Sequence, residues 1–350
     1  MAELVLESVS KHFGDTPAVD AVDLRVRDGE FLALLGPSGC GKTTILRLVA
    51  GFEEVSAGRL LFDDRVVSDA QTHLPPERRR VGIVFQSYAL WPHMSVAGNV
   101  GYPLKVAGVR GEPLRQRVAA ALDVVGLTGF AERRPADMSG GQRQRVALAR
   151  CLVMEPTLML FDEPLANLDV HLRAAMEAEF VDFHRKTGTT IVYITHDQAE
   201  AMAMADRIAV MDAGRIVQLA APETLYAEPA TAMVADFIGQ GVVVDGEVEG
   251  AGEAGCARIA LFGQSSLVRC ADGQPSGPAR VSLRPEGLRL TDDGGFAATI
   301  ERTTYKGGTY AVEARPHAAP DRPVRLSLKR SPAAGAKVRI VIDDAWVIPG

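Results

Sequence analysis

The chain has 350 residues, of which 47% are hydrophobic and 23% charged, and this composition excludes a wholly disordered or fibrous protein. Lys and Arg number 38 against 44 Asp and Glu, and the net charge of −6 argues against a dedicated nucleic-acid-binding protein, which usually carries a basic surplus. Four scattered cysteines (Cys40, Cys151, Cys256 and Cys270) argue against a disulfide scaffold or a zinc site and favour a reducing compartment.

Short apolar runs alternate with helical patterns over the first two thirds of the chain. Strands are expected at residues 3–9, 21–26, 31–35, 80–85, 157–161, 190–195 and 207–211. Helices are expected at residues 42–50, 114–125, 142–154, 172–186 and 198–205. Buried strands that alternate with helices predict a largely parallel sheet that is covered on both faces.

The composition changes after residue 238, where Gly and Pro become frequent and no long helical period remains. Short strands are expected at residues 280–283, 299–304, 310–314, 324–328 and 338–342. Lys306-Gly307-Gly308 is a hairpin signal between two of them. We therefore expect two domains, one over residues 1–238 and a small all-β, barrel-like domain over residues 239–350.

No segment has the pattern of a membrane span or a secretory leader. Met1–Glu7 lacks the basic and apolar regions of a signal peptide, and no stretch approaches about 18 consecutive apolar residues. We expect the chain to act in the cytosol, or at a membrane only through a partner.

The segment between the apolar run at 31–35 and the expected helix at 42–50 has the pattern Gly-x-x-x-x-Gly-Lys-Ser/Thr. Glycines let backbone N–H groups turn toward phosphate oxygens, and the helix N-terminus adds a positive dipole. In this pattern Lys42 reaches the β- and γ-phosphates, and the Thr43 hydroxyl binds Mg²⁺. A plain glycine-rich turn is the alternative. The expected phosphate-binding residues are Gly36, Pro37, Ser38, Gly39, Cys40, Gly41, Lys42, Thr43 and Thr44.

Two carboxylates follow the apolar run Leu158–Phe161. Asp162, at the end of this expected strand, can hold Mg²⁺, and Glu163 can orient or deprotonate an attacking water. Acidic residues also commonly begin loops, which is the alternative reading. The phosphate-binding pattern earlier in the chain favours the magnesium site.

The segment Ser139-Gly140-Gly141-Gln142 opens an expected helix. Ser139 suits an N-cap, and the two glycines permit close approach of another backbone. From these residues alone, a plain capped helix is the alternative.

These motifs occur together with a later Thr195-His196-Asp197, and in this order they resemble the nucleotide-binding subunits of ABC transporters. The resemblance implies an α/β P-loop ABC ATPase cassette with a helical subdomain at about residues 88–153. It also implies that a small all-β, OB-like barrel domain follows the cassette.

The resemblance assigns a role to each matching residue. Phe13 matches the aromatic side chain that stacks on adenine, Gln86 the glutamine that contacts Mg²⁺ and water, and His196 the histidine that contacts the γ-phosphate. The segment from Ser139 through Gly140 and Gly141 to Gln142 resembles the signature that binds the ATP of an opposite subunit, which implies a homodimer or a paired cassette. Taken alone, Phe13 also suits a core position, and His196 with Glu200 also suits a metal pair or a solvated helix face.

Two positions depart from the pattern of the family. Residues 165–169 match the loop that communicates between subunits, but Ala166 stands where relatives often have serine. Met138 replaces the usual leucine before the signature, which is a change of similar volume.

The resemblance extends into the second domain. Ser282–Glu286 is similar to the Arg-Pro-Glu segment of the accessory domain in importers of ferric iron, polyamines, sulfate and some sugars. Within that group, Thr72–Arg79 and Asp236–Gly241 look most like the ferric-iron type. A soluble ABC ATPase, or a nucleotide-dependent regulatory protein not tied to transport, is the alternative class.

For an importer, the resemblance implies ATP hydrolysis with ATP and Mg²⁺. The implied partners are integral membrane permease subunits and a solute-binding protein, with no nucleic acid. The chain would lie on the cytoplasmic side of the cell membrane, held there by the permease. Residues 87–103, which include Trp91, are expected to meet the permease, although an ordinary packed loop is the alternative.

Overall fold

The computed structural model describes residues 2–166, 168–251 and 255–349. The contacts of the chain divide it into two compact units, Met1–Pro222 and Glu223–Gly350. Among the described residues, none of the helices has the length and apolar character needed to cross a membrane.

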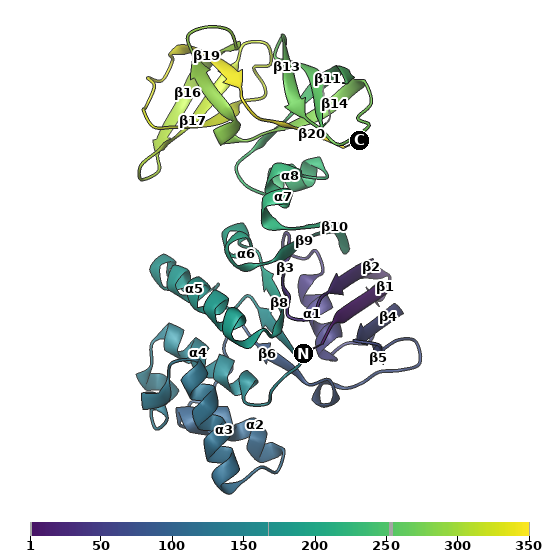
Figure 1. The fold of residues 1–350 in the computed structure, drawn as a ribbon, viewed down its shortest axis with the longest axis vertical. Helices are drawn as coiled ribbons and strands as arrows, with labels where there is room; N and C mark the ends of the chain where they lie inside the picture. Colours follow the sequence, from purple (N-terminus) through teal and green to yellow (C-terminus); the bar gives the residue numbers. More distant parts are fainter. Residues whose placement is uncertain (1, 167, 252–254, 350) are drawn as a thin grey trace. The chain divides into compact units, whose positions relative to one another are not determined.

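A six-stranded sheet forms the centre of the first unit (Figure 1). Its strands, in spatial order, are β10 (Arg215–Ala220), β9 (Arg207–Asp212), β3 (Phe31–Leu35), β8 (Thr190–Thr195), β7 (Leu158–Asp162) and β6 (Val81–Val84). Neighbouring strands are parallel except for the antiparallel pair β9–β10. The prediction of a largely parallel sheet is confirmed, and the carboxyl ends of β3, β7 and β8 meet at one edge.

One face of this sheet packs against α1 (Lys42–Ala50) and a four-stranded antiparallel sheet. Leu34 and Leu160 belong to this layer, together with Ile45 of α1. The strands of the antiparallel sheet, in spatial order, are β2 (Thr16–Val26), β1 (Leu4–Phe13), β4 (Ala57–Phe62) and β5 (Arg65–Ser68).

The opposite face packs against α5 (Val170–Thr187) and α6 (Gln198–Met204). Phe180 of α5 lies with its ring centroid 5.1 Å from that of Phe161 and 6.1 Å from that of Tyr193. Successive side chains of a strand point to opposite faces, so that Leu160 and Phe161 serve different layers of the core.

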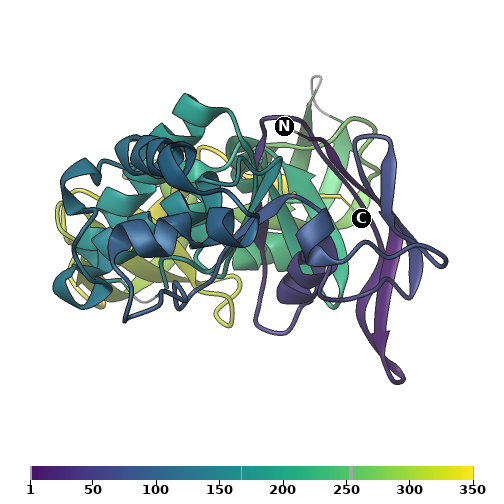
Figure 2. The same ribbon diagram turned by 90° about the horizontal axis from the view of Figure 1, so that it is seen from below.

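Three helices separate β6 from β7 in the sequence and contact one another (Figure 2). They are α2 (Val96–Val106), α3 (Gly111–Val124) and α4 (Gly140–Leu152), accompanied by the short turns η2 (Thr128–Phe130) and η3 (Pro135–Asp137), whereas the turn η1 (Pro76–Arg78) precedes β6. α2 was not predicted from sequence. It begins at Ser95, whose hydroxyl accepts a hydrogen bond from the Gly98 N–H at 3.1 Å. The extent of a helical subdomain, about residues 88–153, stays a prediction.

The second unit contains two short helices, a closed five-stranded barrel and a five-stranded sheet. The helices are α7 (Pro222–Ala227) and α8 (Ala232–Phe237). The barrel consists of β11 (Val242–Ala251), β12 (Cys256–Leu261), β13 (Gln264–Arg269), β20 (Trp346–Ile348) and β14 (Gly277–Leu283). The sheet consists of β15 (Leu288–Thr291), which follows the turn η4 (Pro285–Gly287), then β19 (Lys337–Ile342), β16 (Phe296–Tyr305), β17 (Tyr310–Pro316) and β18 (Val324–Leu328). The predicted β-barrel domain is thus confirmed, and so is the hairpin, which closes where the Lys306 N–H donates to the Thr309 carbonyl at 2.8 Å.

Arg284 connects the two short helices to the β-rich part of the second unit through hydrogen bonds. It is only 6% exposed. Its guanidinium donates to the carbonyls of Tyr226 at 2.9 Å, Ala235 at 3.1 Å and Ile238, and it lies 4.3 Å from the centroid of the Tyr226 ring. A buried guanidinium whose donors are satisfied by carbonyls ties separate segments together.

These contacts explain why the chain divides after Pro222 rather than at the expected boundary of 238/239. The segment 223–238 makes its hydrogen bonds with Arg284 and, through the Tyr226 hydroxyl at 2.5 Å, with Glu286. The functional boundary at 238/239 stays a prediction.

Replacing Arg284 by Met tests this anchor. The substitution leaves two buried carbonyls and one partly buried carbonyl without their donor, and we expect the second unit to lose about 2–4 kcal/mol of stability. Urea unfolding followed by Trp346 fluorescence, in a Trp91→Phe background, measures it.

Arg289→Met is the matched control, because Arg289 forms an exposed ion pair with Asp343 at 2.8 Å. Such exposed ion pairs contribute about 0–1 kcal/mol to the free energy of unfolding. If the two substitutions shifted the unfolding midpoint equally, Arg284 would not be the anchor.

Candidate functional site

The phosphate-loop segment 36–43 connects β3 to α1 and lies against the backbone of other strands. A Cβ atom at Gly36 would lie 2.3 Å from the Met211 carbonyl oxygen, and one at Gly41 would lie 2.4 Å from that of Ala18. Gly41 also has a φ of 106° and, among the described residues, no side chain caps the helix that it begins. Only glycine fits these two positions, and the first N–H groups of α1 stay available to an anion.

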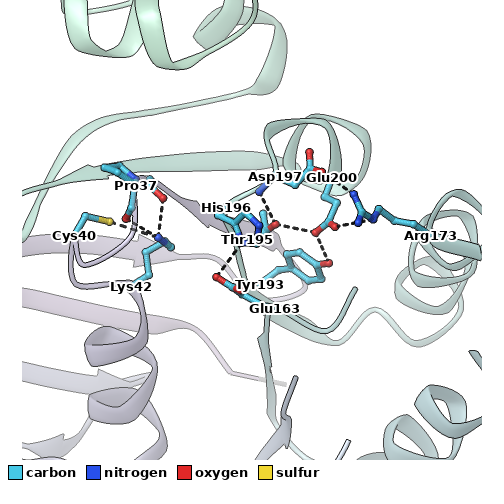
Figure 3. Close-up of polar contacts among 11 residues, drawn as sticks. Pro37, Cys40, Lys42, Glu163, Arg173, Tyr193, Thr195, His196, Asp197 and Glu200 are labelled. Carbon is cyan, nitrogen blue, oxygen red and sulfur yellow. Dashed lines mark hydrogen bonds and ion pairs between the residues drawn. The ribbon is translucent and has the colours of Figure 1, made fainter. Parts of the chain in front are cut away.

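Lys42 is buried inside this loop (Figure 3). Its Nζ donates to the carbonyls of Gly36 at 2.7 Å and Pro37 at 2.9 Å, and lies 3.7 Å from Cys40 Sγ. The ammonium donates to neutral carbonyls of the same loop and, within the part of the chain that the structure describes, forms no ion pair with a carboxylate, although its charge acts on Asp162. A loop with a free helix N-terminus and a buried cation is suited to hold phosphate oxygens.

Two carboxylates lie at the carboxyl end of β7. Burial raises the pKa of Asp162, the charge of Glu163 raises it further, and Arg47 and Lys42 partly offset this rise. Glu163 has a left-handed φ of 46°, an uncommon conformation for a residue with a side chain. Its N–H donates to the Ile194 carbonyl of β8 at 3.0 Å, which holds it beside the next strand.

His196 follows β8 and faces Glu163 (Figure 3). Its Nδ1 lies 3.2 Å from Glu163 Oε1, and its side chain is 58% exposed. The structure therefore brings together the predicted Glu163 and His196 at the sheet edge from which the phosphate loop also extends. An accessible imidazole beside a carboxylate can contact the same ligand or water as the carboxylate.

A buried network below His196 was missed in the sequence analysis. Glu200 is 3% exposed, and its Oε2 accepts hydrogen bonds from the Tyr193 hydroxyl at 2.9 Å and Thr195 Oγ1 at 2.8 Å (Figure 3). Burial raises the pKa of Glu200. The alternatives of a metal pair or a solvated helix face for His196 and Glu200 are therefore wrong. His196 precedes α6, whose N-cap is Asp197, so the two residues do not share a helix face, and their spacing of four residues gave no sign of what Glu200 would contact.

Arg173 of α5 joins the same network from the side. Its Nη1 donates to Asp197 Oδ2 at 3.0 Å, and its Nε lies 3.7 Å from Glu200 Oε1. The Asp197 side chain also caps α6 by accepting from the Ala199 N–H at 2.8 Å. The backbone on both sides of His196 is therefore held by hydrogen bonds, while the imidazole itself stays accessible.

The signature segment forms a capping box at the start of α4. The Gln142 N–H donates to Ser139 Oγ at 3.3 Å, and the Ser139 N–H donates to Gln142 Oε1 at 3.0 Å. A Cβ atom at Gly141 would lie 3.0 Å from Leu172 Cδ1 of α5, and Gly140 packs near Leu168. Within the described residues, no hydrogen bond or ion pair connects this segment to the phosphate loop of the same chain.

The two remaining predicted site residues, Phe13 and Gln86, are both exposed. Phe13 is 48% exposed, and Lys11 Nζ lies 5.1 Å from its ring centroid, so the alternative of a core position is wrong. Gln86 follows β6 in a turn. Ala166 and Leu168 are described, whereas Asn167 lies outside the described residues.

An open groove of about 750 Å³ borders the segment that follows Gln86. Trp91 and Tyr102 lie in it with ring centroids 4.3 Å apart. Arg150, near the end of α4, lies 5.1 Å from the Trp91 ring and donates to the carbonyls of Tyr88 at 2.8 Å and Ala89 at 2.6 Å. α4 thus carries the signature at its first turn and holds the Gln86–Trp91 segment at its last turn.

Comparisons with known proteins match both parts of the chain. Residues 19–166 match the family described as ABC transporter, and residues 281–348 match the TOBE domain. The spermidine/putrescine import ATP-binding protein PotA of Oleidesulfovibrio alaskensis is 45% identical over 317 residues, which cover 89% of this chain and 84% of that protein. The Fe(3+) ions import ATP-binding protein FbpC of Brucella abortus is 45% identical over 306 residues, which cover 87% of this chain and 85% of that protein.

Solved structures resemble the first part of the chain. The cbiO1 structure from Clostridium perfringens, part of the ABC transporter complex cbiONQ, has a TM-score of 0.60 at 31% identity and covers 64% of this chain and 90% of its own. The dimeric structure of the ATP-binding cassette MJ0796, bound to ADP and Pi in a post-hydrolysis state, has a TM-score of 0.54 at 30% identity. It covers 63% of this chain and 98% of its own.

Replacing Glu200 tests the network that positions His196. Glu200→Ala leaves two buried hydroxyls unpaired, and we expect a loss of about 2–4 kcal/mol in the free energy of unfolding. Glu200→Gln keeps an acceptor at the same place and is expected to cost about 1 kcal/mol or less. Urea unfolding followed by Trp91 fluorescence, in a Trp346→Phe background, measures both.

Glu155→Ala serves as the control, because the Glu155 side chain is 75% exposed. Equal effects of the Ala and Gln substitutions at position 200 would show that its hydrogen bonds do not stabilise the loop of His196.

Proposed function

Because the chain belongs to the import ATP-binding subunits of ABC transporters and is an ATPase, we propose that it powers the uptake of a small solute, with ferric iron as the first candidate, through a separate membrane permease. The observation that carries the proposal is that the buried Lys42 of the phosphate loop and the Glu163–His196 pair lie at the same edge of the sheet. This arrangement provides phosphate binding, a base for water and a second polar contact for the terminal phosphate.

ATP would bind with its phosphates in the segment 36–44. The backbone N–H groups at the start of α1 and the Lys42 ammonium would exchange their present environment for phosphate oxygens. The exposed Phe13 ring offers its face to adenine. Glu163 would orient or deprotonate the attacking water, and His196 would contact the γ-phosphate.

The donor set at this edge fits Mg²⁺. Thr43, Gln86 and Asp162 offer a hydroxyl, an amide oxygen and a carboxylate, which are the hard oxygen ligands that Mg²⁺ prefers. Part of the rise in the pKa of Asp162 comes from the charge of Glu163, and a divalent cation there would relieve this repulsion. When bound, the ion would neutralise charge on the phosphates during transfer.

The signature segment supports a paired arrangement of two cassettes. Ser139 and Gln142 satisfy each other, and their capping box makes no polar contact with the described phosphate loop of the same chain. We therefore propose that Ser139, Gly140, Gly141 and Gln142 bind the ATP held by an opposite cassette. A single cassette would then hydrolyse ATP slowly, since each site needs residues from both.

Glu163→Gln tests the catalytic assignment. Removing a general base lowers a rate by about 100- to 10,000-fold, and we expect ATP hydrolysis to fall in that range while ATP binding persists. The variant should also collect as an ATP-bound dimer. Phosphate release and size-exclusion chromatography with ATP measure the two effects, with Glu155→Gln as the control.

Hydrolysis by Glu163→Gln at the wild-type rate would refute the role of Glu163. If the Glu163→Gln variant lost hydrolysis but stayed monomeric in the presence of ATP, the catalytic role of Glu163 would stand and the paired arrangement would be refuted.

The groove beside Trp91 supports docking of the permease. It combines exposed apolar side chains with the Arg150 guanidinium, and it begins directly after Gln86, which would contact the magnesium site. A helix of an integral membrane permease packed there would sense the ATP site through Gln86. We propose that the chain is held in this way at the cytoplasmic side of the cell membrane, in a system that also has a solute-binding protein.

Ferric iron is the first candidate solute, because the segments Thr72–Arg79 and Asp236–Gly241 look most like those of the ferric-iron importers. Spermidine or putrescine is the second candidate, ahead of sulfate or a sugar, because a relative named for polyamine import reaches the same 45% identity as the one named for ferric-iron import. Identity does not separate the two, since the solute is handled by the partner proteins. Uptake of radiolabelled ferric iron and of spermidine, with and without this chain, decides between them.

Trp91→Ala in the same uptake assay tests the docking groove. Loss of a buried aromatic anchor costs about 2 kcal/mol or more in affinity, and we expect uptake to fall more than tenfold while ATP binding is retained. Trp91→Phe should restore most of the uptake. Tyr305→Ala, at an exposed aromatic residue of the second unit, is the control, and undiminished uptake by Trp91→Ala would eliminate the groove as the docking site.

A further inference from the structure

A second concave site lies on the five-stranded sheet of the second unit, and none of its lining residues belongs to the proposed ATP site. It is a pocket of about 530 Å³ across the strands β16, β17 and β18. Arg302 and Thr304 from β16, Glu313 from β17 and Arg325 from β18 line it, together with Lys306 and Thr309 of the hairpin.

The strand register places one carboxylate between two guanidinium groups. Glu313 pairs with Arg302 in the ladder of β16 and β17 and with Arg325 in the ladder of β17 and β18. Its Oε1 lies 3.1 Å from Arg302 Nη2 and 3.6 Å from Arg325 Nε. One oxygen cannot use all the N–H groups of two guanidinium forks, and each fork keeps donors for another acceptor.

The pocket therefore has an excess of positive charge. Arg302, Lys306 and Arg325 contribute three cations against the single carboxylate of Glu313, which leaves two uncompensated charges in a chain whose net charge is −6. Among the residues that the structure describes, Lys306 has no ion-pair partner. Side-chain exposures of 70% for Arg302 and 49% for Arg325 leave both guanidinium groups accessible.

The walls between these cations also offer hydrogen-bond donors. Thr304 and Ser327 lie opposite Ala311 on its two sides in the sheet, so a small side chain forms a hollow between two hydroxyls. Thr309 adds a third hydroxyl from the hairpin. The side chains of this pocket can thus donate to many acceptor atoms around a central hollow.

We propose that this pocket binds a small dianion, with Arg302, Arg325 and Lys306 as the charge partners and the hydroxyls as additional donors. A phosphate monoester and a dicarboxylate share the chemistry that the pocket requires, namely two negative charges and several acceptor oxygens. The planar forks of the two arginines match either group by paired hydrogen bonds. The second unit would then carry a ligand site of its own in addition to the ATP site of the first.

Calorimetric titration of the full chain with inorganic phosphate and with succinate tests the proposal. A non-hydrolysable ATP analogue at saturating concentration occupies the phosphate loop up to the position of the γ-phosphate, and chloride at matched ionic strength corrects for general screening. We expect one saturable site for at least one of the two dianions. Tighter binding of phosphate assigns the pocket to phosphate monoesters, and tighter binding of succinate assigns it to dicarboxylates.

Two matched double variants locate the site. Lys306→Gln with Arg325→Gln should weaken binding at least tenfold, because it removes two of the three charge partners. Lys329→Gln with Arg330→Gln removes the same charge from exposed positions outside the pocket and should leave binding within about twofold. The proposal is overturned if neither dianion saturates the chain, or if both double variants lose binding equally.

Discussion

The site depends on how closely the phosphate loop approaches the backbone of other strands. Gly36 and Gly41 lie so near the carbonyls of Met211 and Ala18 that a side chain at either position would collide with them. This contact places the loop over the end of the parallel sheet. Since β3, β8 and β7 are neighbours and parallel, the residues that follow them reach the same edge. Lys42, His196 and Glu163 meet for that reason, although they are far apart in sequence.

The first turns of α5 connect the other functional segments. Asp169 caps this helix by accepting from the Leu172 N–H at 3.0 Å. Leu172 packs against Gly141 of the signature helix, whereas Arg173 binds Asp197 and supports the segment of His196. A displacement of the signature helix would therefore act on the same turn that positions His196. This direct packing gives a physical basis for the expected communication of residues 165–169 between subunits.

Features set by local sequence could be predicted, and features set by distant contacts could not. The strand at 31–35 and the Ser139 cap depend on neighbouring residues, and the structure has them where they were expected. The phosphate loop has a local sequence pattern, but its close approach to Met211 and Ala18 could not be predicted from that pattern. α2 was missed because Pro103 and Gly101 disfavour a helix by propensity, while its packing on α3 and α4 stabilises it. Glu200 was misread because only the fold brings Tyr193 and Thr195 to its carboxylate. The attachment of 223–238 to the second unit likewise depends on Arg284, nearly fifty residues away from Ala235.

The ATP site and the proposed dianion pocket attract anions by different physical means. The phosphate loop uses backbone N–H groups and a buried ammonium, so desolvation and fixed geometry provide most of its attraction. The pocket on β16–β18 has long, exposed side chains, and Glu313 already neutralises part of their charge through ion pairs. Salt screens exposed charges far more than buried ones. We therefore expect anion binding in the proposed pocket to weaken more steeply with rising ionic strength than ATP binding in the phosphate loop, so that the two sites would respond separately to the composition of the surrounding solution.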